Sequence, residues 1–296
     1  MNNFWKLTNV LFGWMMRKRG SIVLAVSLVF GALGIGIQAF PSAATERDLS
    51  HLAEAFLPYE AIVDGSGVAF VFLLGLVLLF LIIFLTANSF FTNGRGIYTL
   101  LMLPIRRRQL YFAFGAAALG MLFVYFAAWM LLMTLLYFPV MANYARVAAQ
   151  EVFRLPDGVV VQGLEAARAN GLYLAFRRSV FLSSCFPSSL WQALPLLSGG
   201  LLALASVLYG GLHVGERGGQ VMVMLCGVVF GIYTTAVPLL YLNDVYDAWG
   251  YVLLYLLTIA SAESGVGSVL LFSAVALILL LHIVKLTLHD MENKKA

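Results

Sequence analysis

The feature that most constrains this chain is a series of long apolar runs. A helix rises about 1.5 Å per residue and the hydrocarbon core of a bilayer is about 30 Å thick, so one crossing needs about 20 mostly apolar residues. Such residues make up six runs: Ser21 to Phe40, Gly67 to Ala87, Leu110 to Val140, Leu190 to Leu212, Val221 to Leu242 and Val266 to Lys285. The sequence therefore predicts an all-α, polytopic membrane protein, with six transmembrane helices in a single transmembrane domain, residues 1–296.

Composition excludes the other broad classes of protein. Apolar residues make up 62% of the chain and charged residues 11%, with a mean hydropathy of +0.93. In soluble proteins, about 45–50% of the residues are apolar and about 25% are charged. The two cysteines, Cys185 and Cys226, lie in different surroundings and are predicted to be unpaired. The net charge of +4 comes from clusters beside apolar runs, which favours the lipid bilayer over nucleic acid as a partner.

Lysine and arginine set the predicted orientation. Six crossings put both termini on one side, and short cytoplasmic loops are enriched in Lys and Arg. With both termini in the cytoplasm, the inner side holds 12 of the 18 basic residues and the outer side 11 of the 14 acidic residues. The connection 144–189 carries five arginines on the outer side, but long loops follow the rule less strictly. We therefore expect a multi-pass protein of the cell membrane with cytoplasmic termini.

Residues 1–20 predict an amphipathic helix in the headgroup plane. Its two faces carry apolar residues on one side, Phe4, Leu7, Leu11, Trp14 and Met15, and polar or small residues on the other, Asn2, Lys6, Asn9, Gly13 and Arg17. Two roles fit this pattern: an anchor that fixes the first span, and an elbow that transmits motion. The apolar stretch that follows is longer than that of a secretory signal, which predicts a retained first span.

The spans lack the side chains that catalysis or ion coupling usually requires. Their apolar interiors contain no Asp, Glu, Lys or Arg, whereas proton relays and ion-coupled transporters usually bury such groups. The four histidines are scattered, and the chain contains neither an H-E-x-x-H metal motif nor a G-x-x-x-x-G-K-[ST] phosphate loop. We therefore expect no catalytic residues, no metal and no cofactor in this chain, which cannot hydrolyse ATP on its own.

The most informative segment joins the second and third spans. Residues 88–112 read NSFFTNGRGIYTLLMLPIRRRQLYF, and 88–109 are predicted to be cytoplasmic. Ile97, Leu100 and Leu101 share one face of a short helix, which Pro104 must stop or kink. An apolar face held at the cytoplasmic surface needs a partner.

This segment resembles the transmembrane subunits of ABC transporters of the second exporter type, which handle drugs, antibiotics and peptides. The resemblance rests on the order Gly96, Tyr98, Thr99, Leu100, Leu101, Leu103, Pro104, Ile105 and Arg106. It implies a coupling helix that docks on a separate cytoplasmic ATPase subunit, which binds ATP and Mg. The residues that it assigns to ATPase coupling are Arg95, Tyr98, Leu100, Leu101, Leu103, Pro104 and Arg106. A Glu common in that family before the glycine is missing here, where the chain reads Thr92, Asn93, Gly94, Arg95.

The resemblance extends to the plan of the chain. That family has a re-entrant element between spans five and six, and residues 243–265, with a 12-residue apolar run from Ala248 to Ile259, occupy this position. Glu263 then lines an external gate, or is an ordinary solvated turn residue. The external connection 143–189 is longer than is usual in the family and predicts a turn at Pro156 to Gly158 and a helix-like stretch ending near Gly171. A recognition cap and a packing element over the span ends fit it equally.

Glycines mark a predicted seam between two permease subunits. The resemblance implies that spans one and five form this seam, where Gly31 and Gly34, and Gly227 and Gly231, fall. Packing within one chain is the alternative. The expected function is that of an exporter permease that moves a drug-like, peptide or lipid substrate and pairs with an identical or different permease. The other functions considered are a membrane scaffold or sensor subunit and an ion-coupled carrier.

Overall fold

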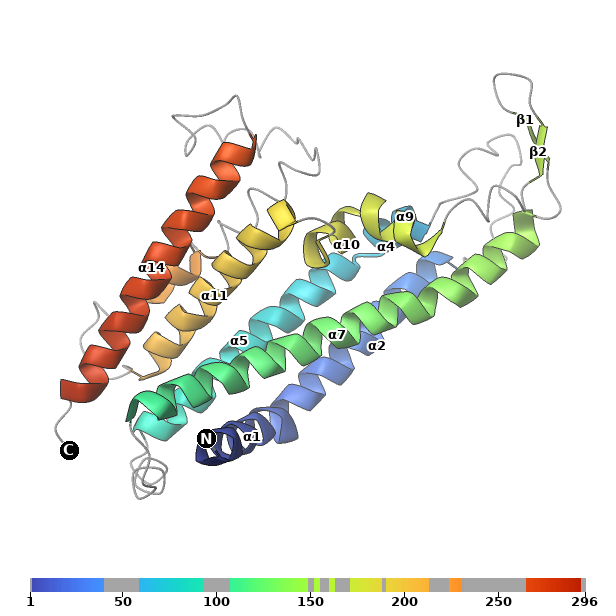
Figure 1. Ribbon diagram of the computed structural model, residues 1–296. Helices are drawn as coiled ribbons and strands as arrows, with labels where there is room; N and C mark the ends of the chain where they lie inside the picture. The colour runs from blue at the N-terminus through green and yellow to red at the C-terminus, as the bar shows by residue number, and fades with distance from the viewer. Residues whose placement is uncertain are drawn as a thin grey trace. The chain divides into compact units, whose positions relative to one another are not determined.

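The fold is known from a computed structural model that describes residues 2–39, 59–92, 107–148, 152–154, 160–162, 171–187, 190–212, 224–229, 231 and 265–293. Its helices are α1 (Asn2–Met15), the π-helix η1 (Met16–Gly20), α2 (Ser21–Ala39), α4 (Tyr59–Gly65), α5 (Val68–Thr92), α7 (Arg107–Ala148), α9 (Leu172–Arg178), α10 (Val180–Cys185), α11 (Leu190–Leu212) and α14 (Gly265–Asn293) (Figure 1). Two short strands, β1 (Val152–Arg154) and β2 (Val160–Gln162), pair antiparallel on either side of the predicted turn. Apart from this ribbon, the elements in the described part of the chain are all helices, which confirms the prediction of an all-α fold there.

Four described helices are long and apolar enough to cross a bilayer: Ser21–Ala39, Val68–Ser89, Arg108–Asn143 and Ala193–Gly211. They coincide with the first four predicted spans. The fifth, Val221 to Leu242, lies mostly outside the described residues, and the sixth falls in α14, whose apolar stretch Ser273–His289 is shorter. Six crossings therefore remain a prediction.

Helices α5, α7 and α14 extend beyond the predicted span ends. α5 continues to Thr92 and α7 runs from Arg107 to Ala148, because helical hydrogen bonding requires no apolar side chains outside the hydrocarbon core. The predicted cytoplasmic segment 88–109 therefore begins and ends within helices, and its central part, residues 93–106, lies outside the described residues. The external connection, predicted from residue 143, likewise begins inside α7.

The chain forms two compact units. Unit 1 comprises residues 1–23, 76–124 and 188–296, and unit 2 comprises residues 24–75 and 125–187. The helices α2, α5 and α7 each continue from one unit into the other.

In unit 1, α1 buries one apolar stripe. Leu7, Leu11 and Met15 are at most 6% exposed, and a Cβ placed on Gly120 of α7 would lie 3.4 Å from the Phe12 ring, so α1 packs against α7. Trp14, on the same predicted apolar face, has a side chain that is 59% exposed, because it lies at the edge of a stripe that repeats every four residues. The position of α1 in the headgroup plane remains a prediction.

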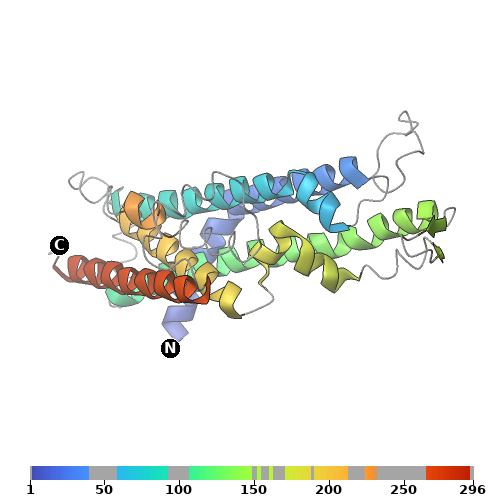
Figure 2. The ribbon, with the colours of Figure 1, turned by 90° about the horizontal axis from the view of Figure 1, so that it is seen from above.

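Also in unit 1, α11 and α14 lie side by side (Figures 1 and 2). Their shared core contains Leu202, Ala205 and Tyr209 of α11 and Ala276 and Ile283 of α14. These apolar residues recur at about one or two helical turns on each helix, so each helix presents one stripe to the other.

All four glycines predicted at the seam between subunits have close neighbours in their own chain. Gly227 faces Ser206 and Ile283, and a Cβ on Gly231 would lie 2.7 Å from the Gly199 carbonyl oxygen. In unit 2, a Cβ on Gly31 would lie 2.5 Å from Cη2 of Trp129, and one on Gly34 would lie 2.9 Å from the Ser66 carbonyl oxygen. Packing within the chain accounts for these glycines, and pairing of two chains through them remains a prediction.

Candidate functional site

Three short helices in unit 2 form a polar cap. We use this name for α4, α9 and α10, residues 59–65, 172–178 and 180–185, which contact one another. α4 precedes the span in α5 and α9 follows the span in α7, so the sequence places both segments on the same side of the membrane. Their contact agrees with that expectation. Which side it is remains a prediction.

A tight turn joins α4 to α5. The Ser66 N–H donates to the carbonyl of Val63 at 3.3 Å, and Gly67 follows with a φ of 70°. Only glycine adopts this left-handed conformation without a steric penalty. The carbonyl of Gly67 then accepts the N–H groups of Phe70 and Val71, at 3.1 and 3.3 Å, which begins α5 directly after α4. The turn fixes the position of α4 at the end of this span.

Asp64 binds the first turn of α10. Its carboxylate accepts hydrogen bonds from the Ser179 hydroxyl at 2.7 Å, the Val180 N–H at 3.0 Å and the Phe181 N–H at 3.2 Å. The Ser179 hydroxyl oxygen in turn accepts the Leu182 N–H at 3.1 Å, as an N-cap residue does. The first N–H groups of a helix have no partner within it and carry partial positive charge. One carboxylate and one hydroxyl therefore satisfy the start of α10.

A second polar contact ties α4 to α9. An oxygen of Glu60 lies 3.6 Å from a guanidinium nitrogen of Arg178, and the Glu60 side chain is 12% exposed whereas that of Arg178 is 57% exposed. The neighbouring Arg177 is exposed as well. The cap therefore presents arginine at its surface while it keeps its glutamate covered.

Tyr59 attaches α4 to α7. Its hydroxyl donates to the Met133 carbonyl at 2.7 Å, and its ring packs edge-on against Tyr137, with centroids 5.3 Å apart. The side chain is 1% exposed, and burial raises the pKa of the Tyr59 phenol above its usual value. The phenol therefore stays protonated and serves as a fixed donor.

Beneath its polar contacts the cap rests on aromatic rings. Phe72 of α5 lies at the centre, with the ring centroids of Tyr125, Trp129 and Phe181 at 5.2, 5.5 and 5.3 Å. The Tyr125 hydroxyl donates to the Phe72 carbonyl at 2.8 Å. Each edge-on aromatic pair contributes about 0.5–1.5 kcal/mol beyond its buried area. The cap is therefore packed firmly onto α5 and α7.

The packing alternative for the external connection thus describes α9 and α10. Phe181, Leu182 and Ser183 of α10 and Ala175 of α9 are buried. The helix-like stretch predicted to end near Gly171 falls largely outside the described residues, and in the structure Gly171 precedes α9 instead. Recognition of a substrate by the cap remains untested.

The chemistry of the cap is structural. Burial raises the pKa of the Cys185 thiol from 9.0 to about 12, so the nucleophilic thiolate is scarce at neutral pH. Among the described residues no group of three His, Cys, Asp or Glu side chains could hold a metal ion. The arrangement can hold helix ends together, and the described contacts assign it no bond-making step.

The predicted coupling residues and the predicted gate are not among these contacts. Arg95, Tyr98, Leu100, Leu101, Leu103, Pro104 and Arg106 lie outside the described residues, as does Glu263. The re-entrant element 243–265 is described only from Gly265, the first residue of α14. These assignments remain predictions.

Sequence reasoning missed the bond between Asp64 and Ser179. A serine before Val180 to Cys185 is a recognisable helix start, so the local signal for α10 was present. The carboxylate that completes it lies 115 residues earlier. A single sequence carries no signal for a pair so far apart.

No protein-family model, curated protein or solved structure matches the chain.

Proposed function

We propose that the chain is the permease subunit of an ATP-driven ABC exporter in the cell membrane, which moves a drug-like, peptide or lipid substrate. It works with a separate cytoplasmic ATPase subunit, which binds ATP and Mg, and with a second permease. The observation that carries the proposal is that the four described spans contain no Asp, Glu or Lys, and only Arg108, at the start of its span.

This composition favours an external source of energy. A carrier driven by a proton gradient usually needs ionisable side chains at membrane depth. The chain has no phosphate loop of its own. The remaining simple source of energy for transport is a partner that hydrolyses ATP. The sequence between α5 and α7 resembles the segment through which permeases contact such a partner.

The cap suggests how motion is transmitted. The predicted coupling segment joins the end of α5 to the start of α7, while the cap and the aromatic rings around Phe72 join the start of α5 to the middle of α7, at Tyr125 and Trp129. A push on the segment would then move two helices as a tied pair, instead of separating their outer ends. This behaviour suits alternating access driven from one side.

Co-purification tests the proposal first. A tagged chain extracted from its native membrane in a mild detergent should retain a protein with a Walker motif, and the reconstituted complex should transport substrate only with hydrolysable ATP. A preparation that never contains such an ATPase contradicts the proposal. Gradient-driven flux through the chain alone would identify an ion-coupled carrier, and a partner regulated without any flux would identify a scaffold or sensor.

A pair of variants tests the coupling segment. Leu100→Asp with Leu101→Asp puts charge on the predicted apolar face and should abolish ATPase binding and ATP-driven transport, because buried charge opposes docking. Thr99→Asp, on the opposite face of the same short helix, is the matched control and should keep both. Full transport by the double variant contradicts the assignment of the coupling segment, and thermal unfolding in detergent verifies that both variants are folded.

A further inference from the structure

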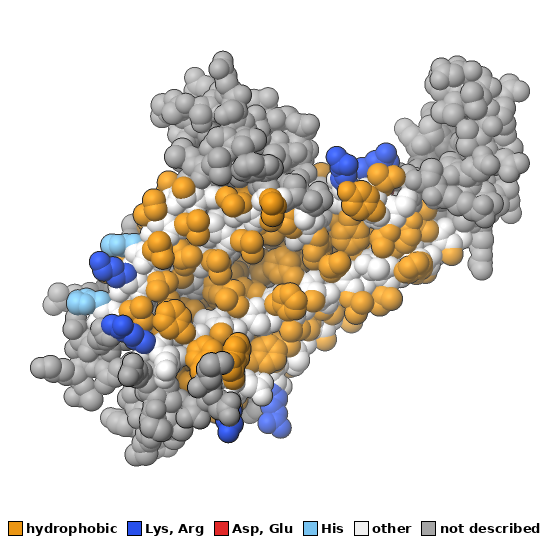
Figure 3. Space-filling view, viewed as in Figure 1, with side chains coloured by type: hydrophobic (Ala, Val, Ile, Leu, Met, Phe, Trp, Pro, Cys, Tyr) orange, Lys and Arg blue, Asp and Glu red, His pale blue; other side chains and the backbone are white. Residues whose placement is uncertain are grey.

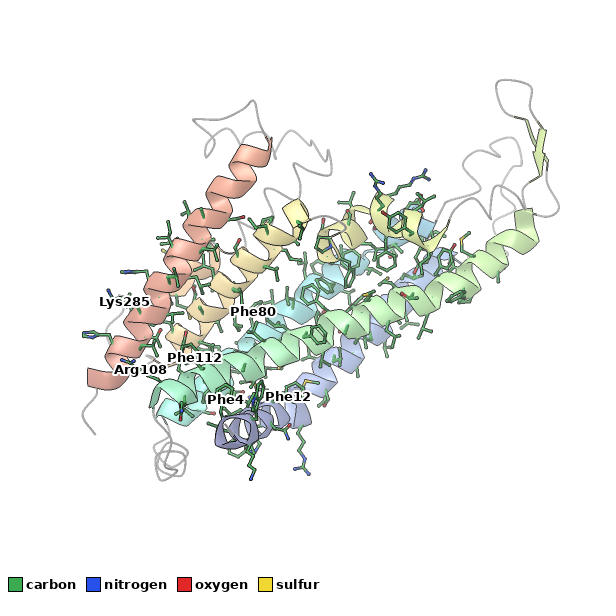
Figure 4. All side chains as sticks on the ribbon, viewed as in Figure 1. Phe4, Phe12, Phe80, Arg108, Phe112 and Lys285 are labelled. Carbon is green, nitrogen blue, oxygen red and sulfur yellow. The ribbon has the colours of Figure 1, made fainter. Side chains whose placement is uncertain are left out.

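The face of α1 that an isolated amphipathic helix would insert into lipid is buried inside the protein. Its apolar stripe packs against α7, and Figure 4 shows Phe4 and Phe12 on the side of α1 toward α7. A Cβ placed on Gly20, in η1, would lie 3.1 Å from Cε of Met121, so the end of this segment also lies against α7. Anything that α1 binds outside its own unit must therefore contact the opposite face.

That opposite face carries two cations with two apolar residues between them. Lys6, Val10 and Trp14 follow one another at a spacing of four residues, so they form one column on the helix. Arg17, in η1, lies eleven residues after Lys6, or about three helical turns, and so continues the same side. Lys6 and Arg17 are exposed, and Val10 and Trp14 are 53% and 59% exposed. We call these four residues the outer column of α1.

The outer column is open and carries an uncompensated positive charge along its own elements. A Cβ placed on Gly13, which lies one turn before Arg17, would meet nothing within 4 Å. Neither α1 nor η1 contains an acidic residue, and α7, on which they pack, contains none either. In Figure 3, blue side chains lie next to orange ones at the lower edge of the view, where Figure 1 draws α1.

The outer column leads directly into a predicted span. Trp14 lies seven residues before Ser21, the first residue of α2, which is long and apolar enough to cross a bilayer. Ile22, at the start of that helix, is 61% exposed. Exposed apolar surface therefore continues from Val10 and Trp14 to the span, at the level where a helix meets lipid. This continuity favours a lipid over an acidic protein as the partner of the two cations.

We propose that the outer column of α1 binds anionic phospholipids in the leaflet where α2 enters the bilayer. The Lys6 ammonium and the Arg17 guanidinium contact the phosphates of the headgroups. Val10 and Trp14 lie between them against the adjoining acyl chains, a depth that suits tryptophan because its ring is largely apolar and its N–H reaches the headgroup. A free phosphate ion would use only the two cations, so the apolar pair selects a lipid.

The outer column does not depend on transport, because none of its residues belongs to the predicted coupling segment. Its test therefore uses the purified, delipidated full chain and measures lipid binding alone. Native mass spectrometry compares retention of dioleoyl-phosphatidylglycerol with that of dioleoyl-phosphatidylcholine, which has the same acyl chains and no net charge. Phosphatidylglycerol brominated on its acyl chains quenches tryptophan fluorescence, and the part of the quenching that Trp14→Phe removes measures contact with Trp14.

We expect the wild-type protein to retain phosphatidylglycerol in preference to phosphatidylcholine. A basic residue near an anionic surface changes affinity about fivefold, so Lys6→Gln with Arg17→Gln should weaken phosphatidylglycerol binding about thirtyfold. Lys6→Arg with Arg17→Lys keeps both charges and should bind nearly as the wild type does. Arg177→Gln, which removes an exposed charge from the cap of unit 2, is the control and should leave binding unchanged.

Four outcomes would overturn the proposal. Equal retention of the two lipids by the wild type would show that the cations do not select an anionic headgroup. Unchanged phosphatidylglycerol binding by the double Gln variant would place the lipid elsewhere. Displacement of the lipid by inorganic phosphate at millimolar concentration, or equal quenching in Trp14→Phe and the wild type, would show that the apolar pair contributes nothing. Because the substituted side chains are exposed, the variants should keep the wild-type helical content, which circular dichroism measures.

Discussion

Replacing Gly31 by alanine tests whether α2 packs within its own chain. The added Cβ would lie 2.5 Å from Cη2 and 2.8 Å from Cζ3 of Trp129, whereas carbon atoms prefer about 3.5–4.0 Å. The indole must therefore move by about 1 Å, but it is fully buried and has the ring of Phe72 5.5 Å away. Overpacking of this kind costs about 1–3 kcal/mol, and the helix propensity of alanine returns about 0.5–1 kcal/mol. We expect a net loss of about 1–2 kcal/mol of unfolding free energy.

Gly36→Ala is the matched control on the same helix. A Cβ there meets nothing within 4 Å, so this variant should be as stable as the wild type or slightly more stable. Denaturant unfolding in detergent micelles, followed by tryptophan fluorescence, measures both variants, and light scattering measures their oligomeric state. If Gly31→Ala unfolds like the wild type but loses a dimer that Gly36→Ala keeps, the intrachain explanation of Gly31 is wrong and the seam between two permeases gains support.

Two further predictions concern the cap. Asp64→Ala removes three hydrogen bonds from the first turn of α10. Since such a cap is worth about 1–2 kcal/mol, amide hydrogen exchange at Ser183 and Phe186, measured by mass spectrometry, should become about tenfold faster. Exchange should not change in the control Arg177→Gln, and unchanged exchange in Asp64→Ala would contradict the assignment of the cap. In a Cys226→Ser background, the raised pKa of Cys185, about 12 instead of 9.0, should make alkylation at about pH 8 roughly a hundredfold or more slower than in the unfolded chain. Equal alkylation rates in the folded and unfolded states would refute the raised pKa. Because the thiol of the unfolded chain ionises first, the stability contributed by this raised pKa should be complete below pH 9.0 and fall as the pH rises toward 12.

The apolar runs predicted the first four long apolar helices because each needs only local information. The first four predicted ranges coincide with helices long and apolar enough to cross a bilayer, since a bilayer fixes both length and composition. The ends were less predictable. α5 continues to Thr92 and α7 to Ala148, where water can solvate side chains and helix geometry no longer shows in hydropathy.

What the sequence could not supply is which helix packs on which. The sequence shows that Gly31 has no side chain and allows a close neighbour. That neighbour could equally be a second chain or Trp129, and only the three-dimensional arrangement distinguishes the two. The same holds for the cap. Glu60 and Asp64 read as ordinary acids of an external loop, and their partners Arg178 and Ser179 lie more than a hundred residues away.

That separation determines when during synthesis the cap can form. Asp64 is synthesised 115 residues before the serine that it binds, which at about 5–20 residues per second is a delay of about 6–23 s. During that interval the predicted spans in α5 and α7 would both have to be inserted, because with only one of them across the bilayer Asp64 and Ser179 would lie on opposite faces. Closure of the cap would therefore require that the predicted hairpin of α5 and α7 has already been inserted.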